Sequence, residues 1–240
     1  MELKVGEMHF KDLNELIREN KDDYVKLDDV FGQRYIGCGL SGRTIDIHGT
    51  PGNALGAYMN DCVINVYGNG QDATGDTMNC GKIIIHGSCG DTTGYGMRGG
   101  EIFIKGSAGY RVGIHMKEYK ELKPVIVVGG KAGDFLGEYL AGGILVVLGI
   151  GAPEEDIVGN FCGTGMHGGV IYIRGKVAEN KLPSQVAQSE ADDDDMKIIK
   201  KYIEVYCNYF GADKDELLKS KFYKLLPNSK NPYTQMYIKN

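Results

Sequence analysis

The chain has 240 residues, a formal net charge of −5 at pH 7 and a pI near 5.6. This balance excludes a strong general attraction to nucleic acid or to anionic membranes, because both require dense Lys and Arg on one face. No run of 18 apolar residues occurs and the amino terminus lacks the apolar segment of a signal peptide, so we expect a cytoplasmic protein whose partner is another protein.

Cysteine and glycine usage narrow the choice of fold and chemistry. The six cysteines form no C-x-x-C pair, so neither a zinc site nor a cysteine-ligated iron–sulfur cluster has its usual local spacing, and we expect reduced thiols. The 36 glycines and the absence of tryptophan are unusual for a globular chain. Glycine this frequent requires a geometric explanation.

The chain begins with a predicted short helix at 12–17, where Asp12 and Glu15 have the relation of a capping box, and continues as a repeat. Seven short apolar runs each end in a glycine, at Gly49, Gly68, Gly87, Gly106, Gly130, Gly149 and Gly175. The steps between successive glycines are 19, 19, 19, 24, 19 and 26 residues. A second glycine follows the first five of these by seven positions, at Gly56, Gly75, Gly94, Gly113 and Gly137. Nineteen residues hold one strand and no helix, so we predict an all-β, single-stranded solenoid of about seven turns whose glycines are structural.

Alternation within each run predicts which side chains face the core, because neighbours on a strand point to opposite sides. Ile45 and Ile47 begin two inward columns that recur in every repeat. A further column is Met59, Met78, Met97, Met116, Leu140 and Met166, which we interpret as core packing rather than as a soft-metal track. The outward column reads Asp46, Asn65, Ile84, Phe103, Val127, Val146 and Tyr172. Its apolar middle requires a cover.

The carboxyl-terminal segment offers that cover. The apolar residues Met196, Ile199, Ile203, Tyr206 and Phe210 have the 3-4-3-4 spacing of an amphipathic helix, with the acidic residues 192–195 at its start and Gly211 after its end. A second short helix is predicted from Asp213, and residues 224–237 are expected to form an extended tail.

Motifs that suggest a ligand are better explained by the repeat. Three segments match G-x-G-x-x-G, at 37–42, 94–99 and 163–168, but the last two run into predicted strands, whereas a dinucleotide site needs a helix there. His48 and His86 lie two turns apart, roughly 10 Å, which is too far to share a metal. No catalytic constellation is legible, so we expect no catalytic, cofactor-binding or metal-binding residue in this chain.

Irregularities in the repeat are where we expect partner contacts. Insertions at 115–124 and 150–159 contribute Lys117, Tyr119, Lys120, Lys123, Glu154, Glu155 and Asp156. The outward apolar residues Ile84, Phe103, Val127 and Val146 join them, because one helix need not cover them all. Solvated loops without a partner are the alternative interpretation of the two insertions.

The repeated pattern resembles a known domain. The segments GDTTGYGMRGG at 90–100, VIVVGGKAGDFLGEYLAGGILVVLG at 125–149 and GNFCGTGMHGGVIYIRG at 159–175 are similar to the GXGXG domain at the carboxyl end of the glutamate synthase large subunit. The resemblance spans about residues 30–178 and implies a right-handed parallel β-helix, without catalytic residues, that holds the glutaminase and FMN-binding synthase domains together. The stretch AGYRVGIHMKEY at 108–119 departs from the family, so contacts of that stretch are not carried over.

We therefore expect three parts: an N-terminal helix and lead-in strand at 1–29, the repeat domain at 30–178, and a helical segment with a tail at 179–240. The resemblance further implies that the chain is this GXGXG domain (domain 3 of the large subunit) as a free-standing subunit of a split, multi-subunit glutamate synthase, which converts glutamine and 2-oxoglutarate to glutamate. FMN and an iron–sulfur cluster are then expected in the partner subunit. The repeat also resembles the β-helical subunit of formylmethanofuran dehydrogenase, a molybdenum or tungsten enzyme, which is the alternative. A homo-oligomer stays open.

Overall fold

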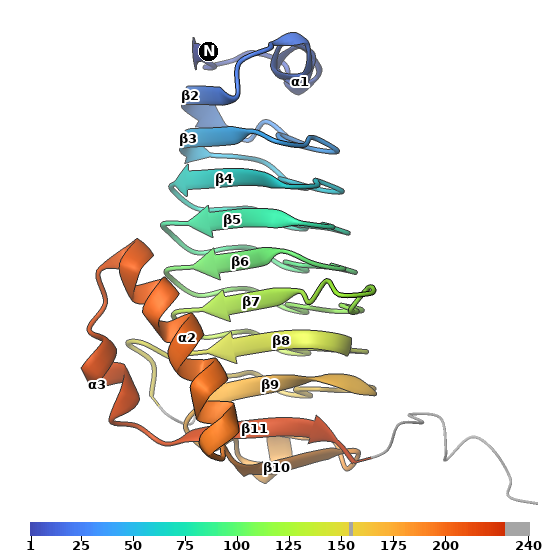
Figure 1. Cartoon of the computed structure of the whole chain (residues 1–240), viewed down its shortest axis with the longest axis vertical. Coiled ribbons are helices and arrows are strands. Elements are labelled where there is room, and N and C mark those ends of the chain that lie inside the picture. The colour runs from blue at the N-terminus through green and yellow to red at the C-terminus, as the bar shows by residue number, and fades with distance from the viewer. Residues whose placement is uncertain (154–155, 229–240) are drawn as a thin grey trace, which may run out of the picture.

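The computed structural model describes residues 1–153 and 156–228, and one sheet runs through this part of the chain (Figure 1). Eleven strands form it in the order β1-β2-β3-β4-β5-β6-β7-β8-β9-β11-β10. The strands are β1 (Glu2–Lys4), β2 (Tyr24–Phe31), β3 (Thr44–Thr50), β4 (Cys62–Tyr67), β5 (Gly81–Ile85), β6 (Glu101–Ile104), β7 (Val125–Val128), β8 (Ala141–Val147), β9 (Gly168–Arg174), β10 (Val186–Glu190) and β11 (Phe222–Pro227). Strands β1 to β9 pair in parallel, each with the next, whereas β11 pairs antiparallel with both β9 and β10.

This sheet corrects the fold class predicted from the sequence. The prediction was an all-β, right-handed parallel β-helix, whereas the structure is a single 11-stranded mixed sheet accompanied by helices. The repeat signal covers only the parallel strands, and the chain then folds back to add the antiparallel pair. Residues 224–227, expected to be part of an extended tail, belong to β11, and residues 229–237 of that expected tail lie outside the described residues.

The register of the parallel strands confirms the predicted inward columns. Ile64 pairs with Ile45 on one side and with Ile83 on the other, and the same alignment continues to Ile171 in β9. These side chains are buried, together with the column that begins at Met59. The methionine column therefore fills the core, because it lies in the same buried cluster as the inward isoleucines.

Before each of the strands β3 to β9 lies a short segment with three left-handed residues at alternate positions. The segment preceding β6 has Thr92 at φ 54°, Gly94 at 72° and Gly96 at 57°. The amides of Thr92 and Gly96 donate to the next turn, whereas the amide of Gly94 donates to Thr74 of the previous turn. We call the stacked segments the loop face; they are residues 35–39, 54–58, 73–77, 92–96, 111–115, 135–139 and 161–165.

Glycine is needed at two kinds of position in this repeat. A Cβ on the central residue Gly94 would meet Cδ1 of Ile126 in the core, and the left-handed φ adds strain. A Cβ on Gly68, which closes β4, would meet the carbonyl oxygen of Gly49 one turn earlier. The first case is a filled core and the second a close approach of backbones.

Helix α2 (Asp193–Phe210) covers the outer face of the lower strands (Figure 1). Ile199, Ile203 and Tyr206 belong to one buried cluster with outward residues of β6 to β9. The Tyr206 hydroxyl donates to the Lys105 carbonyl at 2.8 Å. A Cβ on Gly129 would meet this hydroxyl, so the glycine makes room for the helix. The upper end of the outward column stays polar, and there Asp46 accepts hydrogen bonds from Tyr24 and Asn65.

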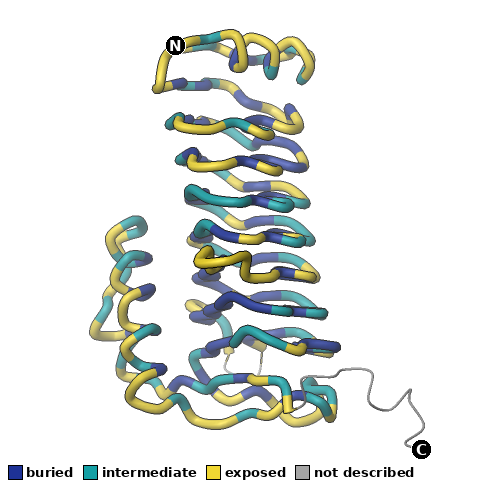
Figure 2. Tube along the Cα trace, turned by 45° about the vertical axis from the view of Figure 1, so that its right-hand side comes forward, coloured by how far each residue is buried: buried dark blue, intermediate teal, exposed yellow. Residues whose placement is uncertain are grey.

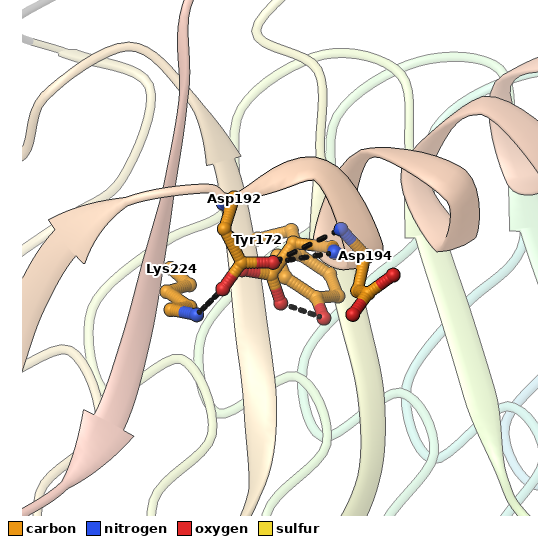
Figure 3. Close-up of polar contacts among 5 residues, drawn as sticks. Tyr172, Asp192, Asp194 and Lys224 are labelled. Atoms are coloured by element: carbon orange, nitrogen blue, oxygen red, sulfur yellow. Dashed lines mark hydrogen bonds and ion pairs between the residues drawn. The ribbon is translucent and has the colours of Figure 1, made fainter.

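The beginning of α2 is fastened to the sheet by a cluster of charged and phenolic groups (Figure 3). Asp192 is the N-cap, and its side chain accepts from the amides of Asp194 and Asp195. The Lys224 ammonium lies 2.8 Å from Asp192 and 2.6 Å from Asp195, and the Tyr172 hydroxyl donates to Asp195 at 2.9 Å. The hydrogen bond from Lys224 holds the pKa of Asp192 at about 2. Burial, followed by the hydrogen bond to Asp195, raises the pKa of Tyr172.

Two further α-helices and a short 3-10 helix (Glu179–Lys181) lie in the described part of the chain. Helix α1 (Phe10–Glu19) buries Leu13 and Ile17 against the N-terminal end of the core, and it begins at the N-cap His9 rather than at the predicted Asp12. Helix α3 (Lys214–Leu218) follows α2, and its N-cap Asp213 accepts from the amide of Glu216, as the sequence indicated.

Candidate interaction surface

Aromatic side chains stack from turn to turn on the loop face. The ring of His115 stacks on Tyr139 with centroids 5.1 Å apart, and it meets Tyr95 edge to face at 5.8 Å. Tyr95, His115 and Tyr139 precede β6, β7 and β8 respectively, so the three rings come from successive turns. Tyr95 is 42% exposed. Exposed aromatic groups held in a fixed arrangement are typical of protein interfaces.

A second aromatic row lies beside the first. The Arg111 guanidinium lies over the ring of Phe135 at 5.1 Å, and Phe135 stacks on Phe161 at the same centroid distance. The guanidinium also donates to Glu138 at 2.9 Å, which fixes its orientation. Phe161 is 54% exposed. Arginine and aromatic residues are enriched at interface centres, so this row extends the candidate surface.

The first inserted loop is anchored on the turns that flank it. Tyr119 and Leu122 exchange two backbone hydrogen bonds of 3.1 and 3.0 Å, which close a tight turn. Glu118 accepts from the amide of Gly143 at 3.0 Å. A Cβ on Gly99 would meet the carbonyl oxygen of Asn79 one turn earlier and also Cβ of Leu122 in the loop, so both the turn and the loop pack closely on this glycine. Residues 117–123 are exposed, and Figure 2 shows this stretch of the trace in yellow in the middle of the stack.

The loop residues predicted as partner contacts have different environments. The Lys120 ammonium lies over the ring of Tyr119 at 5.2 Å, and Lys123 lies 3.6 Å from Glu118. In the second insertion, Asp156 is 3.9 Å from Lys181. Glu154 and Glu155 lie outside the described residues.

A hollow of about 490 Å³ lies between the loop face and the first inserted loop. Its walls include Tyr95, Arg98, His115, Lys117 and Tyr119. Sequence reasoning identified Lys117 and Tyr119 but missed the others. A signal existed for Arg98, because it follows Met97 as Lys117 follows Met116, one 19-residue step later.

Four of the predicted contact residues are not available to a partner. Ile84, Phe103, Val127 and Val146 are each at most 1% exposed. The last three belong to the cluster beneath α2, so the helix of this chain already occupies that patch. Their selection as partner contacts is therefore wrong, since all four side chains are buried within this chain, and for Phe103, Val127 and Val146 the cover is α2 itself.

A larger hollow of about 810 Å³ lies at the N-terminal end of the sheet, bordered by Phe10, Asp28, Asp29 and Phe31. Its two aspartates are already paired with Lys26 and Lys4, at 3.1 Å each.

Within residues 1–153 and 156–228, no group of three or more His, Cys, Asp or Glu side chains is arranged to hold a metal ion. None of the helices in that part of the chain is long and apolar enough to cross a membrane.

The stacked left-handed segments, with glycine at the centre of each, define a repeat protein built around a G-x-G signature. A family described as the GXGXG motif matches residues 24–231, so the chain belongs to the GXGXG family. The uncharacterized protein MJ1350 of Methanocaldococcus jannaschii is 46% identical over 244 residues, which cover 96% of this chain and 94% of that protein.

Two plant enzymes share a shorter stretch. The ferredoxin-dependent glutamate synthase 2 of Arabidopsis thaliana is 38% identical over 73 residues, and the ferredoxin-dependent glutamate synthase of Oryza sativa subsp. japonica is 40% identical over 73 residues. Each match covers 26% of this chain and 4% of the enzyme. The similarity therefore concerns one small part of a much longer protein.

A solved structure shares the fold. A chain of the formyltransferase/hydrolase complex FhcABCD from Methylorubrum extorquens, in complex with methylofuran, superposes with a TM-score of 0.66 and 22% identity. The match covers 84% of this chain and 72% of that chain. At this identity the match establishes a common fold and no common activity.

Proposed function

We propose that the chain is a non-catalytic structural subunit of a split, multi-subunit glutamate synthase, equivalent to the GXGXG domain of the single-chain enzymes. The observation that carries the proposal is the local identity of 38–40% to two glutamate synthases. The loop face supports a binding role, because it presents ordered aromatic groups and cations. The partners are a glutaminase subunit and an FMN-binding synthase subunit, which also carries the iron–sulfur cluster, in the cytoplasm.

The proposal is tested by reconstitution. Co-expression of the three subunits should give a complex that forms glutamate from glutamine and 2-oxoglutarate with reduced methyl viologen as electron donor. Leaving out this chain should reduce glutamine-dependent synthesis while leaving glutaminase activity measurable. Full glutamine-dependent activity of the other two subunits without it would refute the proposal.

A second candidate function is that of a subunit of a formylmethanofuran dehydrogenase complex, a molybdenum or tungsten enzyme. In this case the chain would correspond to the subunit of that complex that contains the same glycine repeat. The observation in its favour is the common fold with a chain of FhcABCD over 84% of this chain. Affinity purification of the tagged chain from its native host separates the two candidates: recovery of a glutaminase with a flavoprotein favours the first, and recovery of a molybdopterin enzyme favours the second.

A further inference from the structure

The hollow beside the first inserted loop carries two cations without a counter-charge. Arg98 and Lys117 occupy the same position in successive turns, and their amides donate to Met78 and Met97 respectively. Adjacent turns are about 4.8 Å apart, so two positive side chains leave neighbouring backbone positions. Among the described residues, neither side chain makes an ion pair or a hydrogen bond. Like charges at this spacing repel each other unless an anion lies between them.

The acidic group of the hollow is already engaged. Glu118 accepts from the amide of Gly143 at 3.0 Å and lies 3.6 Å from Lys123. The nearby Glu138 receives the guanidinium of Arg111 at 2.9 Å. The two uncompensated cations therefore form a positive site on a chain whose net charge is −5. Such a local site attracts a short acidic segment, whereas an extended polyanion such as nucleic acid meets the negative remainder of the surface.

The walls of the hollow are held in place before any partner arrives. His115 has a left-handed φ of 55°, donates its amide to Glu138 at 3.0 Å and stacks on Tyr139. The backbone of Tyr119 is fixed by its paired hydrogen bonds with Leu122. A pre-organised site loses little conformational entropy on binding, so more of the contact energy appears as affinity. The tyrosine walls place aromatic faces beside the two exposed cations, so a bound segment can contact rings and charges together.

From this arrangement we propose that the hollow receives an acidic segment of a partner protein, with its carboxylates on Arg98 and Lys117 and its apolar atoms against Tyr95 and Tyr119. A guanidinium presents paired donors that match a carboxylate, whereas Lys117 adds a point charge. The inference rests on the proposed function for the identity of the partner, which is the synthase or the glutaminase subunit. It assigns the docking site to one hollow rather than to both inserted loops.

The first experiment measures assembly with the two co-expressed subunits. Reversing both charges (Arg98→Glu with Lys117→Glu) should weaken association by roughly tenfold or more, with the loss mainly in the salt-sensitive association rate. The matched control reverses Lys11, an exposed cation in α1, and Lys21, an exposed cation just after it, and gives the same net charge. Weakened assembly in the first variant and unchanged assembly in the control supports the inference. If the unmodified chain, the Arg98→Glu, Lys117→Glu variant and the control variant assemble equally well, the inference is overturned and the proposed function stays intact.

The second experiment tests whether the hollow binds an acidic segment, and it does not depend on the two subunits. Failure of those subunits to form a complex with this chain would refute the proposed function but would leave this test valid. A fluorescent peptide of glutamates alternating with phenylalanines is titrated with the purified chain, and anisotropy is recorded. Binding that is lost in the Arg98→Glu, Lys117→Glu variant and retained in the Lys11, Lys21 control supports an acidic segment. Absence of peptide binding to the unmodified chain overturns the inference. Tighter binding of free glutamate or 2-oxoglutarate in competition with the peptide also overturns it, and identifies a small carboxylate as the ligand instead.

Discussion

The central glycine of each loop segment allows a direct test of how this repeat is built. Replacing Gly94 by Ala adds one methyl group at a residue with φ of 72°, where a Cβ would meet Cδ1 of Ile126. A left-handed backbone costs an L residue about 1–2 kcal/mol. Overpacking a filled core costs about 1–3 kcal/mol. The variant should therefore lose roughly 2–5 kcal/mol of unfolding free energy.

Two further variants separate the backbone cost from the steric cost. Gly96 has φ of 57°, and the nearest atom to a Cβ there is Oγ1 of Thr77 at 3.5 Å, so Gly96→Ala carries the backbone cost without a clash. It should lose about 1–2 kcal/mol. Ile126→Val removes the Cδ1 atom that the new methyl would meet, at a cost of about 0.5–1.5 kcal/mol in the unmodified chain. In the Gly94→Ala chain the same change should cost nothing or restore stability.

Equilibrium urea unfolding followed by far-UV circular dichroism gives the midpoint and slope for each variant. A double-mutant cycle of Gly94→Ala and Ile126→Val should show a favourable coupling of at least about 1 kcal/mol, because the two atoms are in contact. Equal losses in Gly94→Ala and Gly96→Ala, together with no coupling, would refute the steric part of the reasoning. The left-handed φ would then account for the glycine.

The period of the sequence predicts the parallel part of the sheet well, because one pairing rule repeats from turn to turn. The residues assigned to inward columns, such as Ile64 and Ile83, are neighbours across strands. The antiparallel pair was not predicted, since β10 reads VAQSE, which lacks a regular apolar alternation. Its partner β11 follows two helices later, and no repeat marks it. Pairing between segments that far apart depends on tertiary packing.

The candidate surface was only half visible in the sequence. The insertions drew attention to Lys117 and Tyr119, whereas Tyr95 and Arg98 lie within regular turns. The repeat places Arg98 and Lys117 in one column, but only the fold shows that the neighbouring carboxylate, Glu118, is engaged elsewhere. A charged residue in the sequence is therefore a weak indication of a binding site. The stronger indication is a charged side chain that has no counter-charge in the structure.

Three further results are expected from the buried thiols and from the contacts of α2. Burial raises the pKa of the Cys162 thiol to about 12, so iodoacetamide at about pH 8 should leave it unmodified in the folded chain, and labelling detected by mass spectrometry before unfolding would contradict this. Tyr206→Phe removes the hydrogen bond to the Lys105 carbonyl and should lower the unfolding free energy by about 1 kcal/mol in urea titration; an unchanged midpoint would show that the bond adds nothing. The hydrogen bond from Lys224 lowers the pKa of Asp192 from 3.8 to about 2, so its contribution to stability is complete above 3.8 and is lost as the pH falls through about 2. Lys224→Met removes the group that lowers this pKa, so the decline of Tm between those two pH values should become shallower. An equally steep decline in the variant would mean that other carboxylates carry the acid sensitivity of this end of α2.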